Sequence, residues 1–440
     1  MIGNKEKTKV VWLCQFSNGF VRGKLKLSIG LFERVIRKIY HKPNNYNIAD
    51  SAAWITNGIA EFEKFDEIEL HIVAPYPYLS PNIQEFEANG IYYHFFHNEN
   101  KDTIRKYFLK AFHISNYEYK KNRRLISRII KNIQPEIVHL IGAENPHYSL
   151  GVLDVPRNIV TIAQLQTLMS DPDFQNNYPI DVKTYLYRSE IERQIIHQVD
   201  YIGTAVVKYK EIIRKQIYPE AVFLNISLAM AERIVKEGCE KEYDFVYFSA
   251  HISKAADLAI EAFGLAYQKN PRITLDIVGD FTPGDKQQLD EIIQRYGIDK
   301  AVTFEGVFVS HDDVLKQIRK SRYALLPLKI DITSGTIREA MANGIPVLTT
   351  DTGEMGTRRL NRKRQNVLLS RVGDHQALAD NMLKLLEDDS LADILRDNGY
   401  QTSLKRNSNE TIMKRYVEAY QACLDNHRNG TPLPSNVLSI

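Results

Sequence analysis

The stretch from Leu326 to Gly353, LPLKIDITSGTIREAMANGIPVLTTDTG, constrains the fold of this 440-residue chain more than any other segment. The apolar run Tyr323–Leu328 leads into it and is short enough for a buried parallel strand. A helix is expected over Ile337–Ala342, ended by Asn343-Gly344 in a left-handed cap, and a second strand over Ile345–Thr350. The order strand, loop, helix and strand predicts a βαβ unit, and therefore an α/β fold with a parallel sheet.

The loop of this βαβ unit is a predicted anion site. It lies at the carboxyl end of a strand, where open α/β sheets place ligands, and its small residues around Ser334 leave backbone N–H groups accessible. The helix start adds partial positive charge, so a phosphate would be held there. Asp331 precedes the loop and Glu339 lies one turn into the helix, and their carboxylates can accept hydrogen bonds from ribose or sugar hydroxyls. Phosphate and hydroxyl recognition together predict a sugar nucleotide as ligand.

The spacing of this segment resembles the donor-site motif of the retaining GT-B glycosyltransferases of glycosyltransferase family 4, also called group 1. In this chain the motif is carried by Asp331, Glu339, Ala340, Met341, Gly344, Pro346, Val347, Asp351 and Gly353. Two positions depart from the family pattern. The first acid, usually Glu, is Asp331, and Ile332-Thr333-Ser334 replaces the usual Gly-Phe-Gly. Glu339 also fits a capping box with Thr336, which needs no ligand.

The resemblance implies an α/β GT-B architecture, with two Rossmann-like domains whose parallel sheets face a cleft. The length of 440 residues also favours two domains over one. We expect an acceptor-side domain over residues 1–235 and a nucleotide-sugar-binding domain over 243–408, joined by a charged linker, Glu232–Tyr243. A helix over 409–425 is expected to return to the first domain, and residues 426–440 are expected to be a disordered tail.

In the first half, polar loops follow predicted strands. Strands are expected over Val10–Phe16, Glu136–Ile141 and Ile159–Ile162, and parallel strands present their carboxyl ends at one edge of a sheet. Related enzymes often carry His-Asp after the third of these strands, but Ala163-Gln164 stands here, so no base is assigned at that place. The candidate acceptor-side residues are Gly19, Glu144, His147 and Gln164.

In the second half, the resemblance assigns the donor-side residues. Lys254 matches the family's lysine, which lies against the donor diphosphate, whereas the arginine usually found shortly before it is absent. The run Val302–Phe308 stands where these enzymes hold the nucleotide base. The candidate catalytic residues are Lys254, Asp331 and Glu339. The candidate nucleotide-sugar-binding residues are Ser249, His251, Gly279, Val307, Phe308, Ser334, Gly335 and Thr336.

Composition narrows the class of protein. The formal net charge of +3 is too small to indicate a nucleic-acid partner. Cys14, Cys239 and Cys423 are scattered without metal-type spacing, which favours a reducing compartment and predicts no metal site. The apolar run Val10–Cys14 is too short for the core of a signal peptide, and no apolar run reaches about 18 residues. We therefore expect a cytoplasmic protein with no cofactor other than its donor substrate.

Two basic segments leave two interpretations open. Arg22–Lys42 is predicted to be a helix with apolar residues at helical spacing, and Tyr117–Ile133 is a second helix rich in Lys and Arg. Each can be a solvated helix face. Each can also dock onto an anionic membrane surface, which would place the protein at the inner face of the cell membrane.

The function implied by the resemblance is transfer of a sugar from a UDP- or GDP-sugar, with the anomeric configuration retained. The acceptor would be a carbohydrate or a lipid-linked molecule in surface polysaccharide or glycolipid assembly, and the enzyme a hexosyl- or N-acetylhexosaminyltransferase. Two alternatives stay open, because the motif departs from its pattern at Asp331 and lacks the arginine. One is a noncatalytic GT-B-like subunit that binds a partner glycosyltransferase, and the other is a sugar-nucleotide epimerase.

Overall fold

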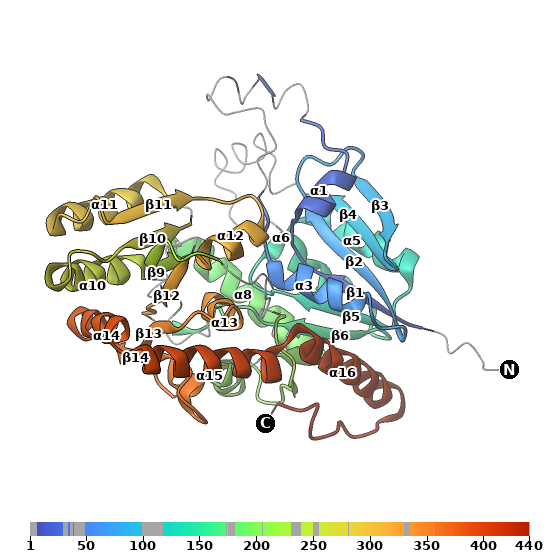
Figure 1. Cartoon of the computed structure of the whole chain (residues 1–440). Helices are drawn as coiled ribbons and strands as arrows, with labels where there is room; N and C mark the ends of the chain where they lie inside the picture. The colour runs from blue at the N-terminus through green and yellow to red at the C-terminus, as the bar shows by residue number, and fades with distance from the viewer. Residues whose placement is uncertain are drawn as a thin grey trace. The chain divides into compact units, whose positions relative to one another are not determined.

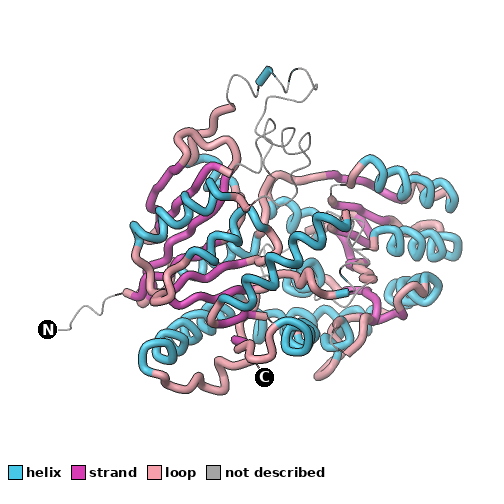
Figure 2. The backbone as a smooth tube through the Cα atoms, turned by 180° about the vertical axis from the view of Figure 1, so that it is seen from behind, coloured by secondary structure: helices cyan, strands magenta, loops and turns pink. Residues whose placement is uncertain are grey.

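The computed structural model divides the chain into two compact units (Figures 1 and 2). The first unit comprises Met1–Gln175, Ile180–Leu228 and Ile412–Ile440, and the second is built from Ala229–Thr411. The structure describes residues 7–29, 34–35, 38, 49–98, 118–172, 174, 181–204, 206–229, 239–249, 255–279, 281–329, 335–354 and 356–439.

The first unit contains an 8-stranded sheet with the order β3-β4-β2-β1-β5-β6-β7-β8. Its strands are β1 Thr8–Leu13, β2 Ile68–Tyr76, β3 Ile83–Ala88, β4 Ile91–His97, β5 Ile137–Ile141, β6 Val160–Gln164, β7 Tyr201–Gly203 and β8 Phe223–Leu224. Every pairing is parallel except β3 with β4. Asn89-Gly90 joins that antiparallel pair with positive φ at both residues, as a two-residue hairpin turn requires. The sequence pattern did not predict β3.

Helices cover both faces of this sheet. They are α1 Gly19–Lys24, α3 Ala53–Phe62, α5 Lys120–Ile133, α6 Pro146–Ser149, α8 Val182–Gln198, α9 Val207–Ile212 and α16 Asn409–Asn429, with short turns η2 Leu150–Asp154 and η3 Ile213–Ile217. Isoleucines of α5 and α8 pack with Val11 and Leu13 of β1 in one core. The neighbouring Trp12 points to the opposite face, where its ring meets Phe62 of α3 and Tyr416 of α16. This alternation along β1 is what a parallel strand buried on both faces requires.

A buried hydrogen-bond chain ties α16 to the sheet of the first unit. The Trp12 Nε1–H donates to the Tyr420 hydroxyl at 2.8 Å, and that hydroxyl lies 2.7 Å from Nδ1 of His139 on β5. The hydroxyl can accept from Trp12 and donate its own proton to His139 when Nδ1 of that imidazole is unprotonated. Burial lowers the pKa of His139 to about 3, in agreement with a neutral imidazole.

The C-terminal segment is packed against the first unit, which contradicts the expectation of a disordered tail after Asn426. Helix α16 continues to Asn429, and Leu438 then forms an antiparallel bridge with Leu224 of β8. Val437 is 5% exposed, so the segment ends in an apolar contact. The tail is mostly polar in sequence, and only two apolar residues, Val437 and Leu438, form this contact. The composition therefore did not predict it.

The prediction of one long helix over Arg22–Lys42 is wrong for the first part of that range. Helix α1 ends at Lys24, and Leu27 forms an antiparallel bridge with Leu79. Ile29 is 3% exposed, so the apolar residues of this stretch enter the unit from an extended backbone. Most of the rest of the predicted helix lies outside the described residues.

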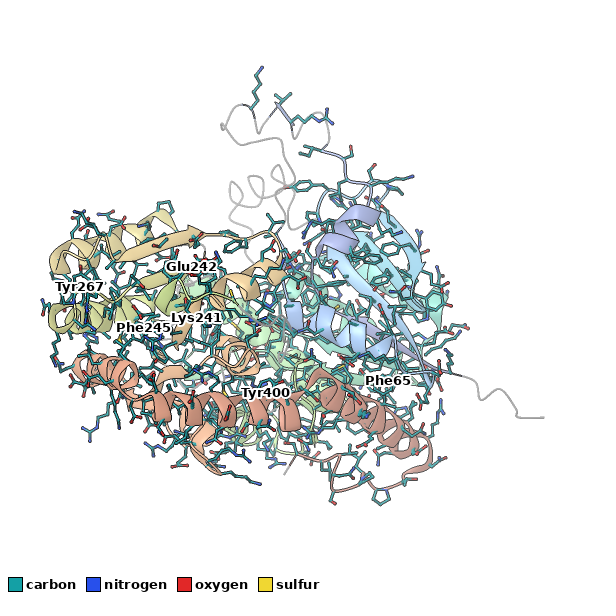
Figure 3. The ribbon with its side chains drawn as sticks, viewed as in Figure 1. Phe65, Lys241, Glu242, Phe245, Tyr267 and Tyr400 are labelled. Carbon is teal, nitrogen blue, oxygen red and sulfur yellow. The ribbon has the colours of Figure 1, made fainter. Side chains whose placement is uncertain are left out.

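The second unit contains a 6-stranded parallel sheet with the order β11-β10-β9-β12-β13-β14. Its strands are β9 Tyr243–Phe248, β10 Leu275–Val278, β11 Val302–Gly306, β12 Ser321–Leu325, β13 Val347–Asp351 and β14 Leu368–Arg371. Its helices are α10 Ala256–Lys269, α11 Pro283–Tyr296, α12 His311–Ile318, α13 Gly335–Ala342, α14 His375–Glu387 and α15 Asp389–Asn407, with a short turn η5 Thr357–Asn361. In the middle of the sheet the ring of Phe245 (Figure 3) lies 5.6 Å from that of Tyr323 on β12.

The βαβ unit predicted from the sequence is present as β12, α13 and β13. Gly344 has φ +67 and ends α13 through N–H bonds from Gly344 to Met341 and from Ile345 to Ala340. The left-handed cap at Asn343-Gly344 is confirmed, and the chain turns there directly into β13.

Candidate functional site

The order of strands in the second unit creates a switch point in its sheet. Strand β9 lies between β10 and β12, so the chain leaves β9 toward one side of the sheet and β12 toward the other. Helix α10 begins at Ala256 after β9, and α13 begins at Gly335 after β12. Ligands of open α/β sheets bind outside the carboxyl ends of the strands at such a point.

Glu339 lies at this end of the second unit, within the first turns of α13. The residue is 9% exposed, and its Oε1 lies 3.1 Å from Nε2 of His311, the first residue of α12. This contact places one carboxylate oxygen of Glu339 beside an imidazole nitrogen. His311 was not singled out from the sequence; the only indication was a histidine at the start of a helix that follows β11.

Arg338 precedes Glu339 on α13 and is half-buried. Burial, and then the nearby Arg359 guanidinium, lower the pKa of Arg338 to about 10, so the side chain stays cationic at neutral pH. A half-buried cation on the helix that starts at the switch point favours an anionic ligand there.

Ion pairs fix the neighbouring loops at the same edge. Lys329 follows β12, and its Nζ lies 2.6 Å from Asp257 in the first turn of α10. Asp351 at the end of β13 accepts from Nε and Nη2 of Arg358 at 3.0 and 2.7 Å, and this pairing lowers the pKa of Asp351. The loop after β12 is thus tied to the start of α10, and the connection after β13 is held by an ion pair within itself.

The other donor-side residues are placed as follows. Ser249 is buried just after β9, and Gly279 follows β10 with its N–H donating to the Gly306 carbonyl at 3.0 Å. Val307 is 55% exposed, whereas Phe308 packs partly against the core of the unit. Gly335 and Thr336 are the first residues of α13, which begins two residues before the predicted start at Ile337. Lys254, His251, Asp331 and Ser334 lie outside the described residues, so the structure does not test their predicted roles.

In the first unit, polar side chains gather around Gly142, directly after β5. Glu144 Oε1 accepts from Asn145 Nδ2 at 3.0 Å. With the Gln166 amide oriented to satisfy its neighbours, its nitrogen donates to the same Oε1 at 3.3 Å and its oxygen accepts from Trp54 Nε1 at 3.3 Å. We call Glu144, Asn145, Gln166 and Trp54 the Gly142 cluster.

Burial raises the pKa of Glu144 to about 7, and the Arg188 guanidinium opposes this shift. The buried Glu192 has its pKa raised to about 8 by burial, although it accepts from the backbone N–H groups of Met169 and Ser170 at 2.8 and 3.1 Å. Glu144 contributes to the shift of Glu192 through like charge. Perturbed carboxylates at the carboxyl end of a parallel sheet are typical of functional sites.

The remaining acceptor-side candidates are dispersed along the same edge. His147 Nε2 lies 2.6 Å from Gln15 Oε1, and the His147 carbonyl accepts from Asn122 at 2.7 Å, so this histidine has structural partners. Gln164 is 1% exposed at the end of β6 and packs over Gly203. Gly19 is exposed at the start of α1, separated in sequence from the Gly142 cluster.

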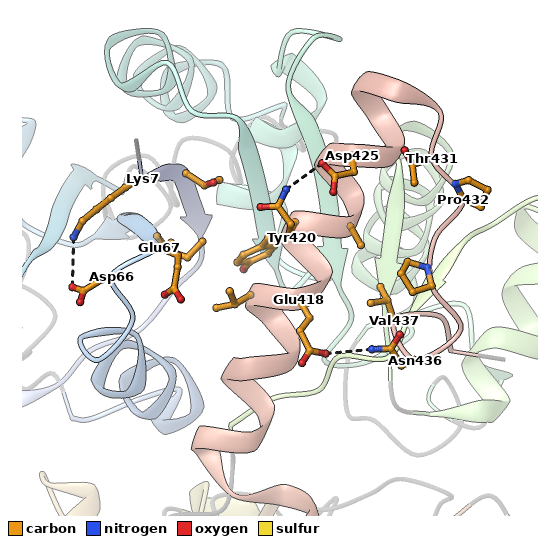
Figure 4. Close-up of a pocket in the computed structure, with 16 residues that line it drawn as sticks. Lys7, Asp66, Glu67, Glu418, Tyr420, Asp425, Thr431, Pro432, Asn436 and Val437 are labelled. Atoms are coloured by element: carbon orange, nitrogen blue, oxygen red, sulfur yellow. Dashed lines mark hydrogen bonds and ion pairs between the residues drawn. The ribbon is translucent and has the colours of Figure 1, made fainter. Parts of the chain in front are cut away.

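A groove of the first unit lies at the opposite end of its sheet (Figure 4). Its cavity of about 950 Å³ is lined by residues before β2, such as Asp66 and Glu67, and by α16 residues, such as Glu418 and Tyr420. Thr8 and Ile68, the first residues of β1 and β2, also line it. Since parallel sheets use their carboxyl ends for ligands, this groove is not the candidate active site.

Two further properties of the described residues bear on the site. No group of three or more His, Cys, Asp or Glu side chains within the described part of the chain is arranged to hold a metal ion. None of the helices in the described ranges combines the length and the apolar character needed to cross a membrane.

A comparison with protein families gives a match over the second unit. Residues 231–402 match the model of the family described as glycosyl transferases group 1. No curated protein sequence matches the chain at a significant level.

Solved structures show the fold. Sucrose-phosphate synthase from Thermosynechococcus elongatus is 14% identical with a TM-score of 0.65, covering 94% of this chain and 98% of that one. HepE from Anabaena in complex with UDP-glucose is 15% identical with a TM-score of 0.61, covering 94% and 99%. A TarM mutant from S. aureus in complex with Fondaparinux, alpha-GlcNAc-glycerol and UDP is 15% identical with a TM-score of 0.54, covering 67% and 58%. The chain has the GT-B fold, as the sequence predicted.

Proposed function

We propose that this protein is a retaining glycosyltransferase of glycosyltransferase family 4 that uses a UDP- or GDP-sugar. It moves a hexosyl or N-acetylhexosaminyl group to a carbohydrate or lipid-linked acceptor in surface polysaccharide or glycolipid assembly. The observation that carries the proposal is the position of Glu339. Its buried carboxylate lies on α13, in the strand-loop-helix unit at the switch point of the domain that matches group 1 glycosyltransferases.

The donor nucleotide is held by complementary groups on α13. Oε2 of Glu339 accepts hydrogen bonds from the ribose hydroxyls, while His311 holds Oε1 in place. The N–H groups of Gly335 and Thr336 and the positive end of the helix face the diphosphate. The relatives HepE and TarM bind UDP, which supports a uridine or related nucleotide.

The chemical step requires stabilisation of the departing diphosphate. Glycosyl transfer passes through an oxocarbenium-like state, so negative charge grows on the leaving group. Lys254 and the helix N–H groups are assigned to that charge, with Arg338 as a further cation on the same helix. One preorganised donor of this kind contributes about a hundred- to a thousandfold in rate. Asp331 is assigned to the hydroxyls of the transferred sugar.

The proposal also places the acceptor at an anionic membrane surface on the inner side of the cell membrane. Support comes from α5, whose exposed side chains Lys120, Lys121, Arg124, Arg128 and Lys131 form one basic face. Several such cations contribute about 1 kcal/mol each near anionic lipid. The protein should cosediment with vesicles containing phosphatidylserine at low salt and leave them at high salt, because salt screens the attraction. If it stays in the supernatant at low salt, α5 is a solvated face and the acceptor is delivered from solution.

A transfer assay tests the enzymatic proposal. The full chain is incubated with a panel of UDP- and GDP-sugars and simple glycoside acceptors, and the product is followed by proton NMR. We expect one donor to give a product with the anomeric configuration of the donor sugar. A product of inverted configuration would refute the retaining mechanism. Donor binding without any turnover on the panel would favour the noncatalytic subunit.

A further inference from the structure

We infer that His71 and His94 form a pH-sensitive contact that holds the edge strands β4 and β3 to the rest of the first unit's sheet. The contact is complete when the two imidazoles together carry one proton more than two neutral rings. It is broken when the pair loses that proton or gains another. This device belongs to the first unit alone and does not depend on the proposed function.

The two histidines are the middle members of a hydrogen-bonded chain of four side chains across β2, β4 and β3. His71 Nε2 lies 3.0 Å from Glu69 Oε1, and His71 Nδ1 lies 3.0 Å from His94 Nε2. His94 Nδ1 lies 2.8 Å from Glu85 Oε1. His71 is buried, and its ring stacks on that of Tyr92 at a centroid distance of 4.8 Å, so the imidazole is held in place.

The number of protons in this chain follows from its donors and acceptors. An ionised carboxylate can only accept, so His71 Nε2 and His94 Nδ1 must each carry a proton. The contact between His71 Nδ1 and His94 Nε2 needs one proton more. The three contacts therefore use three protons, whereas two neutral imidazoles carry only two. When all three hydrogen bonds are formed, one of the two histidines is an imidazolium.

A change in the number of protons breaks the chain in either direction. After loss of the third proton, two nitrogen lone pairs face each other at 3.0 Å, or one ring turns an unprotonated nitrogen toward a carboxylate. After gain of a fourth proton, both facing nitrogens carry hydrogen and repel each other. The complete chain therefore exists only within a limited range of pH, and the two rings titrate as one unit.

The acid limit of this range depends on His71. Burial is the main cause that lowers the pKa of His71; Glu69 opposes this shift, and the positive charges of His94 and of Lys9 on β1 add to it. Because burial disfavours charge on His71, the third proton belongs to His94 and a fourth would go to His71. The lowered pKa of His71 moves uptake of the fourth proton to a pH below the ordinary histidine range, so the complete chain persists further into the acid.

Charged groups on the neighbouring elements act on the same pair. On β3, Glu85 is paired with His94 and Glu87 with Tyr92 in the strand register, and their negative charge favours the third proton. Helix α5 packs against β2 and β4, and its positive charge disfavours the fourth. The exposed cations of α5 are Lys120, Lys121, Arg124, Arg128 and Lys131.

The edge strand β3 also holds the stretch that follows α1. Gln84 of β3 accepts from the Lys26 N–H at 2.8 Å and donates to the Lys26 carbonyl at 2.6 Å. Leu27 forms a bridge with Leu79, shortly before β3. Residues 25–29 are therefore held less firmly when the contact between the histidines is broken. Since histidines titrate around a pKa of about 6.5, the pair links pH near neutrality to the order of this edge.

Hydrogen exchange of the full chain, measured from about pH 5 to about pH 8, tests the inference. Amide protection factors, which correct for the intrinsic exchange rate at each pH, are compared between residues 83–97 and β5 of the same unit. We expect protection of residues 83–97 to be greatest near about pH 6 and to fall about five- to tenfold on either side, as the loss of one hydrogen bond predicts. Protection of β5 should show no such maximum.

Variants separate the titration from the packing of the side chains. His94→Gln should retain most of the protection and lose its maximum, because an amide donates and accepts without titrating in this range. His427→Gln, which changes an exposed histidine of the same unit, should keep the maximum. A maximum that persists in His94→Gln, or protection in the wild type that is constant or changes in one direction only, overturns the inference.

Nitrogen-15 NMR of the imidazole rings gives a direct second measurement. The two rings are assigned by the loss of their signals in His71→Gln and His94→Gln. We expect His71 to keep a proton on Nε2 and His94 to keep one on Nδ1 throughout the transition, while the proton between the facing nitrogens is lost as pH rises. Independent titration of the two rings, or an unprotonated Nδ1 of His94 at the pH of greatest protection, overturns the inference.

Discussion

At the scale of single residues, the proposed function depends most on two carboxylates, Glu339 in the second unit and Glu144 in the first. One oxygen of Glu339 lies beside His311, and one oxygen of Glu144 accepts hydrogen bonds from Asn145 and Gln166. The other oxygen of Glu144, Oε2, is buried and accepts no hydrogen bond from the protein. Held in this way, a carboxylate loses little conformational entropy when it binds, which favours affinity and orientation.

His311 is expected to act as a positioning residue for Glu339. His311→Ala should weaken UDP or GDP binding by about three- to tenfold, because the carboxylate would lose its fixed orientation. His311→Gln should recover most of the affinity, since its amide N–H can donate to Oε1 of Glu339. Calorimetry on both variants checks this, together with KM and kcat for the donor. Tighter binding in His311→Ala would mean that the histidine competes with the ribose for Glu339.

At the scale of elements, one hydroxyl links the buried face of α16 to the sheet. The Tyr420 hydroxyl joins Trp12 of β1 to His139 of β5, and all three side chains are buried. The helix is therefore fixed to the middle of the sheet through two neighbouring strands. No short-range sequence pattern predicts this contact, because the residues that form it are separated by up to 408 positions.

Tyr420→Phe should lower the free energy of unfolding by about 1–3 kcal/mol. The change removes no apolar surface, but it leaves the Trp12 N–H and His139 Nδ1 buried without partners. Urea denaturation followed by tryptophan fluorescence measures the loss. Tyr267→Phe is the matched control, since Tyr267 (Figure 3) is half-buried on α10 against Phe263, and it should change stability by only a few tenths of a kcal/mol. Equal losses in both variants would contradict the role given to the Tyr420 hydroxyl.

At the scale of the whole molecule, the sequence predicted the fold class because local signals and global fold agreed. The β12–α13–β13 unit was readable from its apolar run and from the Asn343-Gly344 cap, whose left-handed Gly344 the structure confirms. Hairpin strand β3 was missed although Asn89-Gly90 marks its turn, because its residues alternate weakly between apolar and polar. The prediction that the tail after Asn426 is disordered was wrong. The tail is anchored by a bridge to Leu224, which belongs to a strand of only two residues.

The sequence predicted only those parts of the candidate sites that depend on short spacing along the chain. A motif fixed by short spacing identified Glu339, but its partner His311 comes from another strand-helix connection, which spacing along the chain does not reveal. Glu144 could be placed at the carboxyl end of β5 from the sequence alone. Its unequal oxygens depend on Gln166 and Trp54, which only the tertiary fold brings together.

Calorimetric titration of the full chain with UDP and GDP tests the central claim most directly, because donor binding at Glu339 is the step on which the proposed function depends. We expect one of the two nucleotides to bind the wild type with one site per chain. Glu339→Ala should weaken it at least tenfold, equivalent to about 1.4 kcal/mol, while Glu354→Ala, an exposed carboxylate of the same unit, should leave it unchanged. Binding that is absent for both nucleotides, or that is equal in Glu339→Ala and the wild type, would contradict the account.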